Sequence, residues 1–268
     1  WSARKAARGV PLGAAVARER PVSYSLALPC GVGGARMGEL GISKLAGEAV
    51  YDVVVVGAGP VGSATARDVA RAGLRVALLE VHREVGRPVT CAGLVTPRAL
   101  EVAGCSAQVV LRSISGSRVY GASGGELFLD GGGVKAVVID RARLDRELAD
   151  QAAGAGADLM LGVKVSGLER VDGHVRVAAQ RDGRDFSIEA RLLVGADGPS
   201  SVVARSLGLP PPPETIACVT AEVRLDTRQS DVVSVFVGPS VAPGWFGWMI
   251  PAQEGWSRLG VGCASGGP

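Results

Sequence analysis

The stretch Tyr51–Gly62 constrains the fold of this chain more than any other part of the sequence. It reads YDVVVVGAGPVG, so four consecutive valines are followed by Gly57, Gly59 and Gly62. A run of β-branched residues is typical of a strand buried on both faces, as in the centre of a parallel sheet. The spacing G-x-G-x-x-G then predicts a tight turn from this strand into a helix.

The residues after the turn complete a dinucleotide-binding unit. A helix is expected from about Pro60 to Ala72, and a second strand from Arg75 to Leu79 leads to Glu80. The amino end of the helix favours a pyrophosphate, and an acid in this place binds ribose hydroxyls. A glycine-rich turn without a ligand would leave Glu80 without a role. The sequence therefore predicts an adenine dinucleotide site.

Charge and composition exclude several other classes of protein. Residues 1–36 hold six basic side chains and one acidic, whereas the rest of the chain holds 23 basic and 25 acidic. So neutral a body predicts no nucleic-acid partner. The five cysteines form no C-x-x-C pair and only two histidines occur, which favours a reduced, cytoplasmic chain without a metal site. Prolines and glycines interrupt the longest uncharged stretch, 232–253, so no membrane-spanning helix is expected.

The chain divides into three predicted segments. Residues 1–48 are an Ala/Arg/Gly-rich extension that loosely resembles a transit peptide; Met37 is a plausible natural start, and we expect the segment to be poorly ordered. Residues 49–209 form the nucleotide-binding domain, with a short inserted sheet near 107–139 made of strands at 113–120, 126–129 and 135–139. Residues 210–268, after the prolines at 211–213, begin a second domain with strands at 216–224, 232–237, 244–250 and 257–262.

Further elements are expected inside the nucleotide-binding domain. A helix capped by Asp140 presents Leu144, Leu148 and Ala152 on one face. A strand at 158–161 and an antiparallel meander at 163–194 follow. Asp197 and Gly198 then stand at another junction of strand and helix, where the carboxylate could hold a ribityl or ribose hydroxyl, or a water on the pyrophosphate.

Together these motifs resemble the FAD-dependent oxidoreductases of the aromatic-hydroxylase-like superfamily. Within it, the run Cys91-Ala-Gly-Leu94 is similar to the cysteine–glycine loop of the geranylgeranyl reductase family. The segment Pro243–Pro251 is similar to the nine-residue signature of that family, in which Phe246 replaces a tyrosine and Ile250 a phenylalanine. The resemblance implies an α/β fold: a Rossmann-like FAD-binding domain, with a parallel sheet plus an antiparallel meander, and the start of a mainly antiparallel substrate-binding sheet.

The resemblance also implies the cofactor and its contacts. The glycines and Val61 would line the pyrophosphate, Glu80 the adenosine ribose, and the backbone of Val165 the adenine. The loop at 91–93 would lie beside the isoalloxazine and Arg141 near the ribityl phosphate. The implied cofactor-binding residues are Gly57, Gly59, Val61, Gly62, Glu80, Cys91, Ala92, Gly93, Arg141, Val165, Asp197 and Gly198.

An apolar substrate is implied as well. Five of the eleven aromatic residues fall between Phe236 and Trp256. Rings on a strand offer a rigid wall to an isoprenoid chain, and we expect Trp245, Phe246 and Trp248 to form it, although such a cluster can also be an ordinary core. The family resemblance implies reduction of C=C bonds in geranylgeranyl chains of lipids or prenyl diphosphates, with hydride from reduced FAD.

Several points stay open in the sequence. NADPH or reduced ferredoxin could be the electron donor, and peripheral membrane contact is compatible with a lipid substrate. Cys91 is the candidate catalytic residue, but it could equally be a small buried side chain. A further Gly-Asp motif of the superfamily does not occur between Trp256 and Pro268, so we expect a C-terminally truncated chain that retains FAD weakly. The alternatives are an FAD-dependent monooxygenase or halogenase of an aromatic substrate, or a non-catalytic nucleotide-binding fragment.

Overall fold

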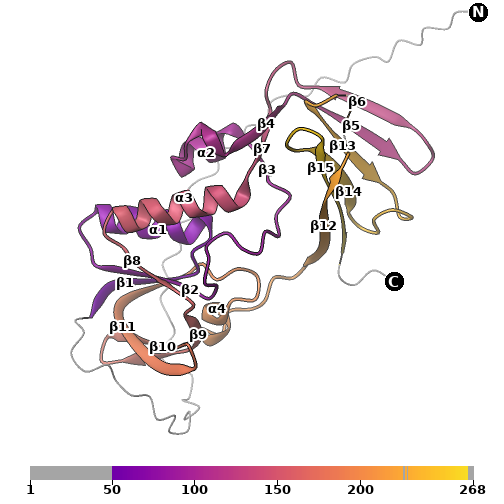
Figure 1. The fold of residues 1–268 in the computed structure, drawn as a ribbon. Coiled ribbons are helices and arrows are strands. Elements are labelled where there is room, and N and C mark those ends of the chain that lie inside the picture. The colour runs from indigo at the N-terminus through magenta and orange to yellow at the C-terminus, as the bar shows by residue number, and fades with distance from the viewer. Residues whose placement is uncertain (1–49, 226, 228, 265–268) are drawn as a thin grey trace, which may run out of the picture. The chain divides into compact units, whose positions relative to one another are not determined.

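The computed structural model describes residues 50–225, 227 and 229–264, so the expectations for residues 1–48 lie outside it. A six-stranded mixed sheet carries the glycine turn (Figure 1). Its order is β8-β2-β1-β11-β10-β9, with parallel pairing from β8 to β11 and antiparallel pairing from β11 to β9. The strands are β1 (Tyr51–Val56), β2 (Val76–Glu80), β8 (Asp158–Leu161), β9 (Lys164–Val171), β10 (His174–Arg181) and β11 (Arg184–Gly195). The predicted parallel sheet with an antiparallel meander is confirmed.

The valines of β1 are buried on both faces, as predicted. Val53 and Val55 belong to a cluster that contains Ala66 of helix α1 (Pro60–Arg71) and Ala149 of helix α3 (Arg141–Gly154). Val54 and Val56 pack instead with apolar residues of β2 and the meander. Strand geometry sends alternate side chains to opposite faces, so the part of this strand from Val53 to Val56 needs apolar side chains on both faces.

The helices begin and end for local reasons. Besides α1 and α3, the described residues form α2 (Pro97–Ala103), the 3₁₀ turn η1 (Ala107–Val109) and α4 (Val202–Ser206). Asp140 caps α3 as predicted, because its Oδ1 accepts a hydrogen bond from the Arg143 amide at 3.0 Å. Leu144, Leu148 and Ala152 are buried on the inner face of α3.

A second six-stranded sheet has the order β12-β15-β14-β13-β5-β6. Only the β13–β5 pairing is parallel in it. Its strands are β5 (Gly116–Gly121), β6 (Glu126–Asp130), β12 (Ile216–Arg224), β13 (Val232–Val237), β14 (Phe246–Pro251) and β15 (Trp256–Ala264). A three-stranded sheet of β3 (Leu94–Val95), β7 (Ala136–Ile139) and β4 (Val110–Ile114) packs against it through Ile114, Val138, Val233 and Ile250.

The expected single inserted sheet near 107–139 is wrong. Its predicted first strand, 113–120, is broken at Ser115, whose amide donates to the Asp231 carbonyl at 2.8 Å and whose hydroxyl donates to the Asp231 carboxylate at 2.5 Å. The part before Ser115 pairs with β7, and the part after it pairs with β13 and β6. The residues near 107–139 therefore serve two sheets. The domain boundary at 209 stays a prediction, with two strands of the second sheet lying before it.

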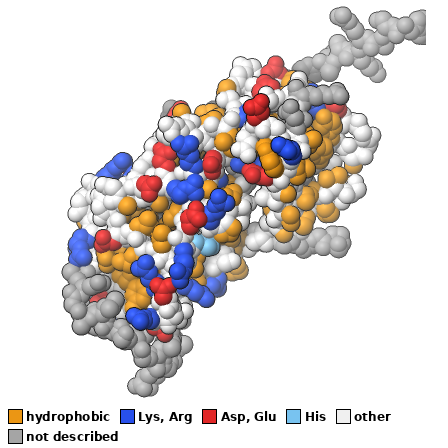
Figure 2. Space-filling view, viewed as in Figure 1, with side chains coloured by type: hydrophobic (Ala, Val, Ile, Leu, Met, Phe, Trp, Pro, Cys, Tyr) orange, Lys and Arg blue, Asp and Glu red, His pale blue; other side chains and the backbone are white. Residues whose placement is uncertain are grey.

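Basic and acidic side chains are interspersed on the face drawn in Figure 2. Ion pairs connect neighbouring elements, for example Arg83 with Asp182 at 2.6 Å and Arg146 with Glu84 at 3.3 Å. Both pairs are solvent-exposed, so each contributes little to stability.

Candidate functional site

The three glycines of the turn are surrounded differently. Gly57 has φ +100°, and a Cβ there would lie 2.3 Å from the Ala196 carbonyl oxygen. A Cβ at Gly62 would lie 1.8 Å from the carbonyl oxygen of Gly57. Both positions therefore require glycine for the turn to close. Gly59 has an ordinary φ of −69°, and its Cβ would meet nothing within 4 Å. Gly59 is thus the glycine that faces open space.

Glu80 lies at the end of β2, and its carboxylate is hydrogen-bonded to the backbone of the glycine turn. Its Oε2 accepts a hydrogen bond from the Ala58 amide at 2.9 Å. Its Oε1 accepts from the His82 amide at 3.0 Å and lies 2.6 Å from the His82 ring Nδ1. The carboxylate is largely buried, whereas the imidazole is half-exposed. The sequence predicted the position of Glu80, but nothing in it indicated the pairing with His82.

The turn opens into a cavity of about 470 Å³, which we call the glycine-turn cavity. It is lined by residues from five separate parts of the chain, among them Gly57, Gly59, Glu80, Val165, Asp197 and Gly198. These predicted site residues are thus brought together. Val61 and Gly62 are not among the lining residues; Val61 is 71% exposed on the first turn of α1, and Gly62 is buried beneath the turn.

The Asp197 carboxylate is directed to the amino end of α4. It accepts hydrogen bonds from the Ser201 hydroxyl at 2.6 Å and from the Val202 and Val203 amides at 2.7 and 3.2 Å. Partial burial favours a higher pKa for Asp197, but the bonds from Ser201, Val203 and Val202 outweigh it, so the pKa is lowered. Asp197 lines the cavity while it holds this helix in place.

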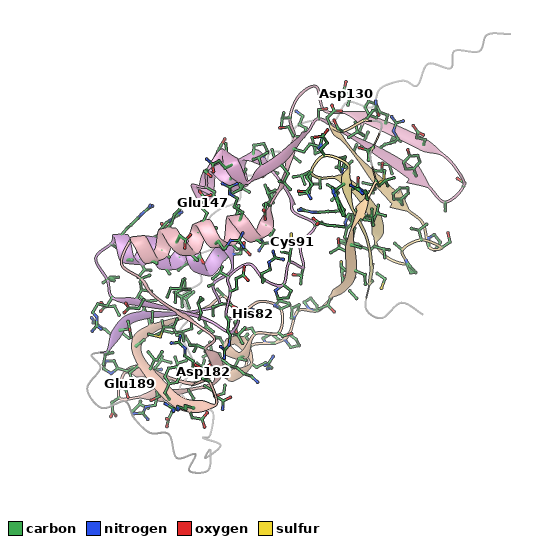
Figure 3. The ribbon with its side chains drawn as sticks, in the orientation of Figure 1. His82, Cys91, Asp130, Glu147, Asp182 and Glu189 are labelled. Carbon is green, nitrogen blue, oxygen red and sulfur yellow. The ribbon has the colours of Figure 1, made fainter. Side chains whose placement is uncertain are left out.

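A second cavity, of about 630 Å³, lies beside the loop at 91–93, and we call it the Cys91 cavity. Cys91, Arg141, Glu222 and Arg258 are among its lining residues. Arg87 and Pro88 line both cavities, so the two adjoin there. Figure 3 shows His82 and Cys91 on the stretch of chain that follows β2.

Charged side chains line the Cys91 cavity, among them Arg141, whose partner Asp145 lines the glycine-turn cavity. The Nε of Arg141 donates to Asp145 Oδ1 at 2.8 Å. Burial would lower the pKa of Arg141, but Asp145 and, to a smaller degree, Cys91 raise it. Burial raises the pKa of Asp145 despite the stabilising contact with Arg141. The Cys91 Sγ accepts a hydrogen bond from the Gly93 amide at 3.3 Å. Arg141 and Cys91 are therefore neighbours in this cavity, and their predicted roles toward the cofactor stay a prediction.

The predicted substrate wall is an aromatic surface made of Trp245, Phe246 and Trp248. The rings of Trp245 and Phe246 stack with centroids 5.1 Å apart, and Phe246 meets Trp248 edge-on at 6.0 Å. Glycines of β15 lie under the tryptophans: a Cβ at Gly260 would be 2.2 Å from the Trp248 ring, and one at Gly262 2.4 Å from the Trp245 ring. Trp248, Ala92 and Leu94 all pack against one buried cluster, which contains Ile114 and Ile250. None of the three aromatic residues is among the lining residues of the Cys91 cavity.

Arg258 is a site residue that sequence reasoning missed. Its side chain is buried in the Cys91 cavity lining and donates to two backbone carbonyls, those of Ala92 and Ile139. An arginine among apolar strand residues was visible in the sequence, but its partners are 166 and 119 residues away.

The residues at these cavities fit FAD. The amino end of α1 begins at Gly59 and has no side-chain cap, which leaves space and helix polarity for a phosphate. An acid follows on the neighbouring strand, and the adjoining Cys91 cavity offers room beyond the phosphates.

Comparison with known proteins defines the class. Residues 50–258 match the FAD binding domain family, and the chain belongs to that family. Within this class, the chain is 32% identical over 221 residues to a digeranylgeranylglycerophospholipid reductase of Methanosarcina acetivorans, a match that covers 80% of this chain and 54% of the relative. A reductase of the same name from Methanothrix thermoacetophila is 33% identical over 219 residues. The predicted resemblance to geranylgeranyl reductases is confirmed, and the chain spans about half the length of these relatives.

Solved structures agree. A geranylgeranyl bacteriochlorophyll reductase-like protein from Thermoplasma acidophilum aligns with a TM-score of 0.73 and 29% identity, over 80% of this chain and 56% of that one. A p-nitrophenol 4-monooxygenase from Pseudomonas putida aligns with a TM-score of 0.64 at 18% identity, over 80% of this chain and 57% of that one, which shows a shared fold only. Among the described residues, no helix is long and apolar enough to cross a membrane.

Proposed function

We propose that this chain supplies the FAD site and the substrate sheet of a reductase that saturates C=C bonds in geranylgeranyl chains. The observation that carries the proposal is the pair of adjoining cavities that share Arg87 and Pro88, next to a Cys91 loop whose Ala92 packs against the same hydrophobic cluster as Trp248. A nucleotide at one end and an apolar wall at the other are what reduction of a prenyl chain requires. The printed names of the similar reductases support the substrate class.

Each group of residues has a proposed task. The α1 amino end and Gly59 receive the pyrophosphate, Glu80 the adenosine ribose, and Val165 the adenine. The loop at 91–93 flanks the isoalloxazine, and the aromatic surface orients the prenyl chain and excludes water. When bound and reduced, FAD would supply hydride to one alkene carbon while a proton donor completes the addition. Cys91 remains the candidate for a catalytic residue.

The partners and location follow from the same proposal. The substrate is an isoprenoid lipid or a prenyl diphosphate, and electrons come from NADPH or reduced ferredoxin. The protein acts in the cytoplasm and touches a membrane peripherally to reach a lipid. We further propose that residues 49–209 form the FAD-binding domain. Two strands within this range, β5 and β6, belong instead to the proposed substrate-binding sheet.

The variant Gly59→Ala tests the cofactor site. Its Cβ meets no protein atom and its backbone angle suits alanine, so folding should be unaffected. The methyl group enters the space assigned to the pyrophosphate, so FAD affinity should fall by about tenfold or more. Titration of the purified chain with FAD, followed by flavin fluorescence, measures this. Gly154→Ala is the matched control, because a Cβ there also meets nothing within 4 Å. Equal affinities of the two variants would contradict the site.

A second experiment tests the reaction. The chain is incubated without oxygen with FAD, dithionite and a geranylgeranyl lipid, and the molecular mass of the lipid is then measured by mass spectrometry. Addition of two hydrogens per reduced double bond is expected, with Gly154→Ala active and Gly59→Ala impaired. Oxygen-dependent gain of an oxygen atom by an aromatic substrate would instead identify a monooxygenase. Normal FAD binding without either product would leave a nucleotide-binding fragment.

A further inference from the structure

We propose that Arg258 is a positioning residue that fixes the Cys91–Gly93 loop to the substrate sheet. For its effect on the flavin, the inference rests on the proposed FAD site; for the loop itself, it rests on contacts within the chain. Arg258 lies on β15, and the loop precedes β3, so the two are far apart in sequence and meet only in the folded protein.

The contacts of Arg258 join three elements. Its Nη1 donates to the Ala92 carbonyl and to the Ile139 carbonyl, both at 2.9 Å. Its Nε donates to Glu222 Oε1 on β12, also at 2.9 Å. One guanidinium therefore connects the loop, the carboxyl end of β7 and the second sheet. Hydrogen bonds from a charged donor are stronger than neutral ones, which makes this a firm attachment.

Gly93 makes room for this contact. A Cβ at position 93 would lie 2.3 Å from the Arg258 Nη1 and 2.8 Å from the Ile139 carbonyl oxygen, and the residue has φ +72°. Any other side chain at this position would displace the guanidinium. The glycine of the Cys91-Ala-Gly motif and the arginine of β15 are therefore parts of one arrangement.

Because the charge of Arg258 is buried, the side chain depends on its hydrogen bonds to the two carbonyls. The side chain is only 8% exposed, whereas its carboxylate partner Glu222 is 53% exposed. A buried guanidinium must be satisfied by hydrogen bonds, so the two carbonyls are needed to retain it. Glu222 is partly hydrated, so its attraction for Arg258 is weakened by solvent.

The loop has a second attachment on its other side. The Ile139 amide donates to the Gly93 carbonyl at 2.8 Å, and Leu94 pairs with Val138 in the three-stranded sheet. This holds the chain from Gly93 onward, whereas Arg258 holds the carbonyl of Ala92. Loss of Arg258 should consequently release Cys91 and Ala92 while β3 stays paired.

A link between sheet and loop would couple the two proposed binding events. A shift of β15 on binding of a prenyl chain would be transmitted through Arg258 to the carbonyl beside the isoalloxazine. FAD affinity should then depend on a residue of the substrate sheet.

The test measures the loop directly through its cysteine. The purified chain is treated with iodoacetamide, and the labelling rate of each cysteine is followed by peptide mass spectrometry. In Arg258→Met, Cys91 should react about tenfold faster or more, because its loop opens more often. Arg258→Lys keeps the charge but cannot bridge the same three acceptors, so it should recover part of the loss. Glu222→Gln should change the Cys91 rate by less than about twofold.

Other cysteines serve as internal references. Cys218 and Cys263 are exposed. Burial, followed by the charge of Glu147, raises the pKa of Cys105, so we expect this thiol to react slowly. An unchanged Cys91 rate in Arg258→Met would overturn the proposal, and so would an equal acceleration of Cys105, which would show a fold-wide effect. FAD titration of the same variants separates the two ideas. If Cys91 is released in Arg258→Met but the unaltered chain binds no FAD, the positioning role stands and the proposed function fails.

Discussion

At the scale of single residues, the three glycines of the turn have different roles. Gly57 and Gly62 are required because backbone atoms occupy the space where a side chain would be, whereas Gly59 faces open space. The G-x-G-x-x-G spacing predicted all three positions, and it also predicted Glu80. It could not predict the contacts of His82 or Arg258. The first depends on how the chain turns after β2, and the second on a carbonyl 166 residues away in the sequence.

Asp197 gives a pH-dependent prediction. Its pKa is lowered in the folded chain, so its ionised form stabilises α4 above the pKa of the unfolded state, about 3.9, and this contribution is lost as the pH falls through the folded value. Asp197→Asn should lower the free energy of unfolding by about 1 kcal/mol near neutral pH. The difference between the two proteins should shrink below about pH 4, as measured by urea unfolding across pH. A difference that grows toward acid would contradict this assignment.

At the scale of elements, the glycines of β15 are explained by the tryptophan rings that pack on this strand. Alternate residues Arg258, Gly260 and Gly262 share one face, where the glycines leave room for the two indoles and the arginine reaches the loop. The sequence predicted this strand and the aromatic residues. It did not reveal the reason for the glycines, since their spacing has no meaning until β14 pairs with β15.

Gly260→Ala tests this packing. The new Cβ would lie 2.2 Å from the Trp248 ring, so the indole must move. We expect a loss of about 1–3 kcal/mol in the free energy of unfolding and a shifted tryptophan emission spectrum. Gly125→Ala, where a Cβ meets nothing within 4 Å, is the control. Identical spectra and stabilities for both variants would show that Trp248 does not rest on Gly260.

The error in the predicted inserted sheet also belongs to this scale. Alternation of apolar residues identified the strands at 113–120, 126–129 and 135–139 as strands. Alternation carries no information on the partner of a strand, and the partner of β5 is β13, more than one hundred residues later. The hydrogen bonds of Ser115 and Gly116 to Asp231 mark the point where the predicted first strand passes from one sheet to the other.

At the scale of the whole molecule, the second sheet makes the two halves of the chain dependent on each other. A fragment of residues 50–209 would keep β5 and β6 but lose β13, and it would uncover Ile114 and Val138, which are 3% and 0% exposed. We expect this fragment to associate in size-exclusion chromatography and to unfold at a lower temperature than residues 50–268. A monomeric fragment with an unchanged melting temperature would show that the predicted boundary at 209 is a true domain boundary.

Ser115 has a mechanical consequence. It is the single residue between β4 and β5, which belong to different sheets. A connection of one residue cannot extend, so a displacement of the second sheet must also displace β4 and, through β7, the start of α3, where Asp140 and Arg141 lie. Insertion of a few glycines at Ser115 should therefore leave each sheet intact, but a displacement of one sheet would no longer be transmitted to the other.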